Sequence, residues 1–508
     1  MYIVTAKEMY GIDRYTTEEI GMDGKLLMEN AGRAISGKIE SKIEKDDVIT
    51  VFAGSGNNGG DGYVIARTLL NKGYRIAVIQ VVPDEKITGD ARFHKNLFIN
   101  CGGDLSITQD SFEIGEALNQ TDIIIDAILG IGVKGELREP IKTIAVTINE
   151  SPAQVLSVDI PSGLPADEGE TAFDSVQADQ TIVVGYPKMS TFLQHTAPFY
   201  GKWETVDIGF PEAVQTPLTR SVWTHRQFQK SMPIREKDSH KGDHGRGLVI
   251  GGSEEMPGSL AMTVRAALRT GAGLVTAGTV KQAIPVVASQ CIEATNLKLN
   301  ESNGVISGEQ TGVPYEKYDA VALGIGLGRH ESTRALVTDA VRQVDSPLIL
   351  DADGLFHIQN DLELFKNRTA PAVITPHPGE MAMLTGASVK DILRKPFAYA
   401  KGFAREYQVY VVLKGSFTIV TAPDGHQSVN ITGNQGLAKG GSGDVLSGII
   451  LAMTMQHKSL FDAVCNACFV HGKAADLLVS ESRSVYDLMA SDVVEGIGKV
   501  YRTLTAET

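Results

Sequence analysis

The chain has few cysteines for its 508 residues: only Cys101, Cys291, Cys465 and Cys468. Four thiols in a chain of this length are too sparse for a disulfide scaffold and are typical of a reducing compartment, so we expect a cytoplasmic location. Cys465 and Cys468 have the C-x-x-C spacing of redox motifs, but they lie in an apolar helical stretch without a second pair. We therefore interpret them as buried core rather than as a redox or zinc site.

The sequence also lacks long apolar runs and an excess of positive charge. No run of about 18 apolar residues occurs, and the start, MYIVTAKEMYGIDRYTTEEIG, is amphipathic rather than signal-like, so we expect no membrane segment. Lysine and arginine total 47 against 61 aspartates and glutamates, a formal net charge of −14. Sequence-independent nucleic-acid binding requires a basic footprint. We therefore expect no nucleic-acid partner.

The N-terminal part of the chain contains short apolar runs rich in β-branched residues. Between them lie segments whose apolar residues recur with the spacing of an α-helix. Continuous apolar runs are typical of strands that are covered on both faces. The order strand, helix, strand predicts a parallel α/β sheet, preceded by helices over 5–21 and 24–43. The predicted strands lie at 47–54, 75–82, 122–129, 154–161 and 180–187.

This alternation stops between about residues 210 and 240, where prolines and mixed charges are typical of a linker. A second α/β series follows it. We therefore predict an N-terminal domain over 1–212, a linker over 213–240 and a C-terminal domain over 241–508. The strand runs of the second series lie at 245–253, 271–279, 318–328, 346–354, 370–380 and 408–425.

A glycine-rich segment, FAGSGNNGGDGYVIA, follows the first predicted strand and leads into a helix. It matches the G-x-G-x-x-G pattern from Gly54 to Gly59 but lacks the Lys-Ser/Thr of a Walker phosphate loop. Asn57, Asn58 and Asp61 add oxygen atoms, which favour a hard cation beside a bound phosphate. The alternative is that these side chains only form turns and a helix cap.

Further oxygen-bearing residues follow other predicted strands: Asp126 in DAILGIGVKGE, and Asp159 and Ser162 in VDIPSG. In open α/β sheets the ligand crevice lies beyond the carboxyl ends of the strands. The sequence therefore predicts that these residues and the glycine-rich segment meet at one edge of the sheet.

The motifs LLMENAG, GSGNNGGDG, DAILGIGVKGE and VDIPSG resemble, in order and spacing, those of the NAD(P)H-hydrate epimerase domain. The resemblance covers residues 1 to about 212 and implies a Rossmann-like domain. It implies a potassium ion bound by Asn58, Asp126 and Ser162, and Asp159 as the acid/base residue. Lys134 is either a phosphate contact or a solvated surface lysine. The implied dinucleotide-binding residues are Asn57, Asn58, Gly59, Gly60, Asp61, Gly130, Ile131, Gly132, Val133, Lys134, Gly135, Glu136 and Asp159.

A second glycine-rich segment, GNQGLAKGGSGDVLSGIILAM, precedes an apolar helix and carries Gly440, Gly441, Gly443 and Asp444. The N–H groups at a helix N-terminus form an anion hole. An aspartate placed there can take a proton from a hydroxyl that attacks a phosphoryl group. The alternative is that Asp444 only caps the helix.

This segment resembles the turn of the ribokinase-like superfamily that ends in a base aspartate. The motifs HKGDHGRGLVIGGS, LDADG, ITPHPGEM, VVLKGSFTIV and GGSGDVLSG resemble, more narrowly, the ADP/ATP-dependent NAD(P)H-hydrate dehydratase domain, from about 225 to 500. Asp351 and Asp353 either assist Mg²⁺ or cap the following helix, and His377 is otherwise a loop histidine. The resemblance implies a nucleotide site at Lys414, Gly415, Ser416, Phe417, Thr418 and Gly443, a dinucleotide site at Ala261, Gly326 and His377, and Asp444 as the base.

Together the two resemblances imply a bifunctional enzyme that repairs hydrated NADH and NADPH. The R and S forms would be interconverted at C6, and the S form would be dehydrated with ADP, or ATP, and Mg²⁺, which releases phosphate and AMP. The family resemblance also implies a homo-oligomer. Gln435 and Lys439 stand where the family pattern has proline and threonine. A small-molecule kinase and a non-catalytic dinucleotide sensor remain the alternatives.

Overall fold

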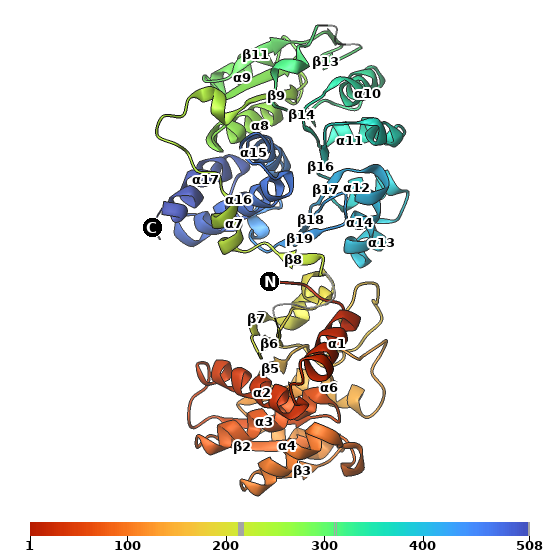
Figure 1. Ribbon diagram of the computed structural model, residues 1–508, viewed down its shortest axis with the longest axis vertical. Coiled ribbons are helices and arrows are strands. Elements are labelled where there is room, and N and C mark those ends of the chain that lie inside the picture. Colours follow the sequence, from red (N-terminus) through yellow and green to blue (C-terminus); the bar gives the residue numbers. More distant parts are fainter. Residues whose placement is uncertain (212–217, 309, 311, 506–508) are drawn as a thin grey trace. The chain divides into compact units, whose positions relative to one another are not determined.

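The computed structural model describes residues 1–211, 218–308, 310 and 312–505. The chain forms two compact units, one of Tyr2–Leu218 and one of Thr219–Thr508 together with Met1. Each is an α/β unit built on its own sheet (Figure 1). Within the described ranges, no helix has the length and apolar character needed to cross a membrane.

The N-terminal unit contains a seven-stranded sheet in the order β3-β2-β1-β4-β5-β6-β7, and all of its neighbouring strands are parallel. An order that begins 3-2-1-4-5-6 is that of the Rossmann fold, so the predicted Rossmann-like class is confirmed. The order reverses between β1 and β4, where such folds bind their ligands. The strands are β1 Val48–Ala53, β2 Arg75–Gln80, β3 Asp104–Ile107, β4 Ile123–Ala127, β5 Gln154–Val158, β6 Gln180–Val184 and β7 Lys202–Val206.

Helices cover both faces of this sheet, as Figure 1 shows. Ile49 and Val51 of β1 point into one apolar core, with α2, α3 and α4, while Phe52 points into the other, with α5 and α6. This two-sided burial explains why the strands read as continuous apolar runs. The helices are α1 Ala6–Arg14, α2 Gly24–Glu40, α3 Asn57–Asn71, α4 Gly89–Asn100, α5 Ser111–Leu118 and α6 Ile141–Glu150, with a π-helical stretch η1 Tyr15–Glu19 and short 3₁₀ turns η2 Asp84–Lys86, η3 Met189–Phe192 and η4 Ala197–Tyr200.

The sequence runs missed the two edge strands of this sheet, β3 and β7. Both contain polar residues and are largely exposed or half-buried. An edge strand has a neighbour on one side only and is incompletely covered, so it needs no continuous apolar run. The periodicity therefore detects the covered strands and not the edges.

The C-terminal unit contains a ten-stranded sheet in the order β11-β10-β9-β14-β15-β16-β17-β18-β19-β8. Its strands are parallel except at the pairs β17–β18 and β18–β19. The predicted run 408–425 is thus a hairpin of two strands. The strands are β8 Arg220–Val222, β9 Arg246–Gly251, β10 Leu274–Thr279, β11 Thr295–Lys298, β14 Ala320–Ile325, β15 Leu348–Leu350, β16 Ala372–Ile374, β17 Tyr410–Leu413, β18 Thr418–Thr421 and β19 Gln427–Asn430, with a separate pair β12 Glu301–Ser302 and β13 Val305–Ile306.

The main core of this unit gathers α8, α15, α16 and α17 against the sheet. Helix α15 is buried along most of its length, because it lies between neighbouring helices and strands (Figure 1). The helices are α7 His225–Ser231, α8 Pro257–Arg269, α9 Ile284–Gln290, α10 Arg334–Gln343, α11 Asp353–Ile358, α12 Pro378–Thr385, α13 Val389–Arg394, α14 Pro396–Tyr407, α15 Ser442–Gln456, α16 Leu460–Glu481 and α17 Ala490–Thr505, with 3₁₀ turns η5 Lys241–His244, η6 Tyr315–Lys317, η7 Glu331–Thr333, η8 Leu362–Asn367 and η9 Gln435–Leu437.

The segment assigned to a linker, 213–240, contains regular structure. Its first residues, up to 217, lie outside the described residues. After them, β8 pairs in parallel with β19, and α7 begins with a capping box between Thr224 and Gln227. The buried Trp223 between these elements donates a hydrogen bond from Nε1 to Asn466 Oδ1 (2.9 Å). This part of the chain therefore belongs to the C-terminal unit.

The C-x-x-C pair lies within α16, where Cys465 and Cys468 are both free thiols and buried in the core. Burial raises the pKa of the Cys468 thiol to about 12 and that of Cys465 well above its ordinary value. The interpretation of this pair as core is confirmed.

A thiol reagent should therefore distinguish the four cysteines of the native protein. We expect rapid labelling of Cys101, which is exposed, and slow labelling of Cys291, Cys465 and Cys468, which are buried. Mass spectrometry of peptides after brief iodoacetamide treatment measures this, and urea-unfolded protein gives the full count. Rapid modification of Cys465 in native protein would contradict the buried assignment.

Candidate active sites

The first glycine-rich segment is mostly helix rather than loop. Asn57 is the first residue of α3, and no side chain caps this helix, so the interpretation of the segment as only a turn and cap is wrong. A methyl group built on Gly54 would lie 1.9 Å from the Ile128 carbonyl oxygen, and one on Gly59 would lie 2.1 Å from the Gly54 oxygen. These two glycines are required because the helix start packs closely against the end of β1 and the chain after β4.

Asn58 presents an unpaired oxygen inside this packed region. Its Nδ2 donates to the Leu129 carbonyl oxygen (2.8 Å), whereas its Oδ1 is buried and has no hydrogen-bond partner among the described residues. A buried acceptor without a partner costs free energy. This oxygen therefore fits a cation or a donor group of a ligand.

Asp126 and Ser162 lie beside Asn58. The carboxylate of Asp126 is fully buried and accepts hydrogen bonds from Ser157 Oγ (2.8 Å) and from the backbone N and Oγ of Ser162. Ser162 Oγ accepts from the backbone N of Leu129 (2.8 Å), whose oxygen binds Asn58. Burial raises the pKa of Asp126, and the hydrogen bonds from Ser162 oppose this rise. The three predicted potassium ligands are thus brought together around one backbone unit.

Asp159 follows β5 in a strained backbone conformation, with a φ of 66°, which costs free energy for a residue with a side chain. Its Oδ1 accepts from the backbone N of Val184 (2.9 Å) and forms an ion pair with Lys188. Lys188 is fully buried and also donates to the Val184 carbonyl oxygen (3.3 Å). The surroundings therefore fix the position of the Asp159 carboxylate.

Lys188 was not predicted from the sequence. It follows β6 in the run GYPKMS, and the one available signal was its place just beyond a strand end. A buried lysine needs a paired anion, and Asp159 supplies it.

Two further carboxylates face this pair. Burial raises the pKa of Asp13 on α1 to about 6; the negative charge of Asp159 adds to the rise, and Lys188 opposes it. Burial also raises the pKa of Asp61 on α3 well above its ordinary value, with Asp159 and Asp13 adding to it. Asp61 was predicted as a site residue, whereas Asp13 was not.

The predicted loop from Gly130 to Glu136 follows β4. Ile131 packs against the apolar cluster of α1, and Gly132 lies against Tyr10, since a methyl group on it would be 2.9 Å from Tyr10 Oη. Gly132, Lys134 and Glu136 are exposed, while the other four residues are half-buried. Helix α1 therefore packs against the loop that the sequence assigned to dinucleotide binding.

A buried ion pair forms the base of the second site. Lys414, just after β17, lies with Nζ 2.9 Å from Asp351 Oδ1, just after β15, and 3.8 Å from Glu380 Oε2 on α12. Ser447 of α15 donates to Asp351 Oδ2 (2.7 Å). Burial alone would raise the pKa of Asp351, but the Lys414 ammonium holds it below its ordinary value. The pair ties two strand ends to helix α15.

Asp444 lies in the first turn of α15, the helix whose Ser447 binds Asp351. The N-cap residue is Gly441, with a φ of 90°, so Asp444 does not cap the helix and that interpretation is wrong. A methyl group on Gly443 would lie 3.5 Å from Lys414 Nζ, which places the glycine turn against the ion pair. Burial raises the pKa of Asp444; a hydrogen bond from Ser259 opposes the rise, and the charge of Asp351 adds to it.

The three residues predicted to bind the dinucleotide in the C-terminal unit lie in different surroundings. Gly326 has a φ of 63° and lies against Ser259, the residue that binds Asp444. Ala261 on α8 is buried in the core, and its carbonyl oxygen accepts from the Cys291 thiol. His377 caps α12 by accepting from two backbone N–H groups and remains exposed.

The run 414–418 forms the turn between β17 and β18, with Gly415 and Ser416 exposed. Lys439 directly precedes the glycine turn at Gly440 and Gly441, and its Nζ donates a hydrogen bond to the carbonyl oxygen of Tyr486 (2.6 Å). The lysine that departs from the family pattern is therefore tethered to the loop before α17.

Asp353 is the first residue of α11 and accepts from the backbone N of Gly328 (2.9 Å) and from Arg329 Nε (3.2 Å). No side chain caps this helix at its N-cap, Ala352. The capping interpretation of Asp351 and Asp353 is therefore wrong. Both carboxylates are engaged by basic side chains instead.

Each unit thus has acidic and basic side chains beyond the carboxyl ends of its parallel strands, and the chain is a two-unit α/β protein whose N-terminal part is Rossmann-like. A family model described as NAD(P)H-hydrate dehydratase matches residues 247–497, and one described as YjeF-related protein N-terminus matches residues 24–190.

Full-length relatives extend these matches. The chain is 35% identical to the bifunctional NAD(P)H-hydrate repair enzyme of Moorella thermoacetica, covering 100% of this chain and 98% of the relative, and 32% identical to that of Escherichia coli, covering 96% and 92%. A crystal structure of the Bacillus subtilis ADP/ATP-dependent NAD(P)H-hydrate dehydratase, co-crystallised with ATP/Mg²⁺, is 35% identical over 56% of this chain and 98% of that one, with a TM-score of 0.49. The chain belongs to the family of bifunctional NAD(P)H-hydrate repair enzymes.

Proposed function

We propose that this chain repairs hydrated NADH and NADPH in two steps. The N-terminal unit interconverts the R and S epimers at C6 of the nicotinamide ring, and the C-terminal unit dehydrates the S epimer to NAD(P)H with ADP or ATP. The observation that carries this proposal is that each unit places one predicted catalytic carboxylate, Asp159 or Asp444, beside a lysine at the strand ends of its sheet.

In the C-terminal unit, Asp444 takes the proton of the C6 hydroxyl as that oxygen attacks a phosphoryl group of the nucleotide. The lone pair of the ring nitrogen then expels phosphate from C6, and loss of a proton from C5 forms the C5=C6 double bond and restores the reduced nicotinamide. A carboxyl group with a raised pKa accepts a proton more readily near neutral pH. The N–H groups of the glycine turn stabilise the charge that develops on the phosphoryl oxygens.

We expect Gly415 and Ser416, which are exposed in the turn after Lys414, to bind the nucleotide together with Gly443, which lies near Lys414 at the start of α15. Asp351 and Asp353 are already held by Lys414 and Arg329. We therefore expect the phosphates, rather than these two carboxylates, to be the main ligands of Mg²⁺, which neutralises phosphate charge when it is bound.

In the N-terminal unit, Asp159 acts as acid/base residue on the hydrated ring, and the surroundings of Asn58 bind its cation. The unpaired Asn58 Oδ1 and the buried Asp126 and Ser162 fit potassium, which supplies positive charge beside the substrate when it is bound. The substrate phosphates extend along α3 and the Gly130–Glu136 loop.

We also propose a cytoplasmic location and a homo-oligomer. All four cysteines are free, as a reducing compartment favours. Tyr10, Ile20 and Leu26 expose apolar surface near the start of the chain, which supports self-association.

The decisive experiment adds hydrated NADH as separate R and S epimers to the full chain with ADP and Mg²⁺. We expect inorganic phosphate and the absorbance of reduced nicotinamide to appear together, from the S epimer at once and from the R epimer through epimerisation. A stable phosphorylated product would favour the kinase alternative. Binding without turnover would favour a sensor.

A further inference from the structure

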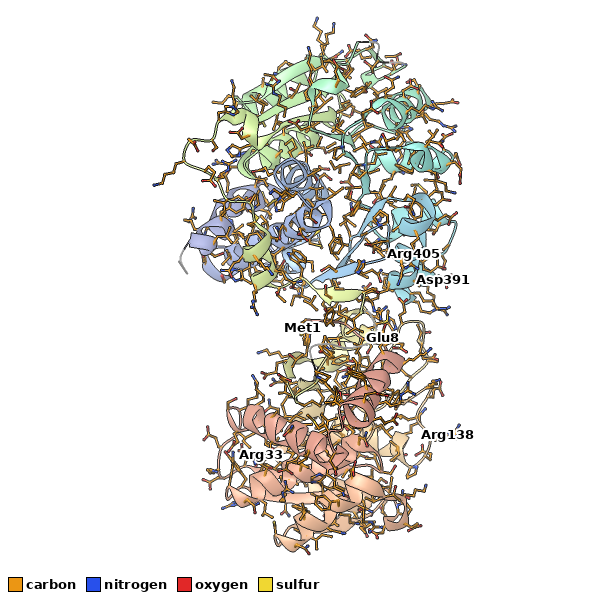
Figure 2. The ribbon with its side chains drawn as sticks, viewed as in Figure 1. Met1, Glu8, Arg33, Arg138, Asp391 and Arg405 are labelled. Carbon is orange, nitrogen blue, oxygen red and sulfur yellow. The ribbon has the colours of Figure 1, made fainter. Side chains whose placement is uncertain are left out.

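Helix α1 is anchored to the segment that carries the buried lysine of the epimerase site. Val4 forms an isolated parallel bridge with Lys188: the Val4 N donates to the Pro187 oxygen (3.0 Å), and the Met189 N donates to the Val4 oxygen (3.1 Å). The next residue, Thr5, starts α1 through a capping box with Glu8, which Figure 2 labels on this helix. The start of the chain is thereby fixed beside the Lys188–Asp159 pair.

The apolar side of α1 holds the helix over the site. Met9 and Ile12 are buried in a cluster that also contacts Ile131 of the Gly130–Glu136 loop and Tyr186. Asp13 is the next residue after Ile12 and is half-buried. Helix α1 therefore contacts both the lysine segment and the predicted dinucleotide loop, and it carries Asp13.

The carboxylate of Asp13 accepts no hydrogen bond from any residue in the described parts of the chain. The titratable groups that face it are Asp159 and Lys188 beyond β5 and β6, Asp61 on α3, and Tyr10 on its own helix. Lys188 is already paired with Asp159. One lysine cannot neutralise three neighbouring carboxylates, so the unpaired ones retain protons more readily.

We propose that Asp13 is the second proton-transfer group of the epimerase site and works opposite Asp159. This inference rests on the proposed epimerase function. Asp159, which forms an ion pair with Lys188, serves as the base, and Asp13 serves as the acid. Two groups with opposite protonation allow a proton to leave one atom of the ring while another atom receives one.

The step balances without any further reactant. Asp159 removes the proton of the C6 hydroxyl, the C6–N1 bond breaks as the C6 carbonyl forms, and the electron pair passes to N1, which takes the proton of Asp13. Rotation about the C5–C6 bond presents the other face of the carbonyl. N1 then attacks C6 and returns its proton to Asp13, while the oxygen recovers its proton from Asp159.

The test compares Asp13→Asn, Asp13→Glu and the exposed control Asp46→Asn in the full chain, following R-to-S conversion by chromatography. We expect Asp13→Asn to lower kcat of epimerisation by about 10²-fold with KM little changed, and Asp13→Glu to recover part of the rate. The wild-type kcat should fall as pH rises above about 6, because Asp13 must be protonated to act as the acid. In Asp13→Asn, this fall of kcat with rising pH should be absent. Dehydration of the S epimer belongs to the C-terminal unit and should be unchanged in all variants, while the partial recovery in Asp13→Glu shows that the N-terminal unit is folded.

If the wild-type chain does not interconvert the epimers, the proposed function fails. If the wild type is active and Asp13→Asn keeps its rate and pH profile, the assignment of Asp13 is overturned while the function stands. A variant in which only KM rises, or in which Asp13→Glu is as poor as Asp13→Asn with the pH limb intact, would show a purely structural role and also overturn it.

Discussion

Replacing Asp444 by asparagine should reduce nucleotide-dependent dehydration by about 10²–10⁴-fold, because general-base contributions have this size. Asparagine keeps the shape of the side chain but cannot accept the proton of the C6 hydroxyl. The N–H groups of the glycine turn and the Lys414–Asp351 pair remain in place, so nucleotide binding should persist. Epimerisation belongs to the other unit and should be unaffected.

The measurement follows phosphate release and reduced-nicotinamide absorbance from the S epimer, and chromatographic R-to-S conversion in the same preparation. Asp345→Asn is the matched control, since it makes the same chemical change at an exposed site in the same unit. Near wild-type dehydration by the Asp444 variant would remove this residue from the proposed role. Equal loss of both activities would indicate misfolding instead.

The local sequence predicted the covered parts of both sheets well. Runs such as 47–54 and 122–129 are strands that helices cover on both faces, so their apolar pattern is uninterrupted. The ligand edge also followed from the sequence, since Asp126, Asp159 and Asp351 each lie at or just beyond a strand end. In the first glycine-rich segment, the sequence pattern could not distinguish glycines that are needed for close backbone packing from glycines that are needed to bind a ligand. Gly54 and Gly59 meet backbone oxygens there.

The sequence analysis did not predict the residues that contact the catalytic carboxylate of the N-terminal unit. Lys188 is 29 residues from Asp159 in sequence, and the two meet only because β5 and β6 are neighbours in the sheet. Asp13 reaches the same place from the first helix, through the bridge between Val4 and Lys188. The apolar periodicity of the sequence cannot predict that these residues meet, because their contact depends on the order of the strands and on how the start of the chain is anchored.

Replacing Lys414 by methionine should destabilise the C-terminal unit by about 3–5 kcal/mol, because it leaves the buried Asp351 carboxylate without its cation. Asp351 is 1% exposed, and besides Lys414 it keeps hydrogen bonds from Ser447 and from the backbone N of Ala352. Neutral donors do not replace a paired charge in a buried site. Dehydration should also be lost, since Gly443 and Asp444 are positioned against this pair.

The two tryptophans make the effect measurable unit by unit. Trp223 is buried in the C-terminal unit and Trp203 lies on β7 of the N-terminal unit, so in a Trp203→Phe background urea unfolding followed by fluorescence reports the C-terminal unit. The double variant Lys414→Met with Asp351→Asn should recover part of the lost stability, because it removes the unpaired charge. Lys390→Met, at an exposed position on α13, should leave the midpoint unchanged. If Lys414→Met alone leaves the midpoint in place, the ion pair does not hold the strand ends to α15, and the geometry proposed for Asp444 needs another support.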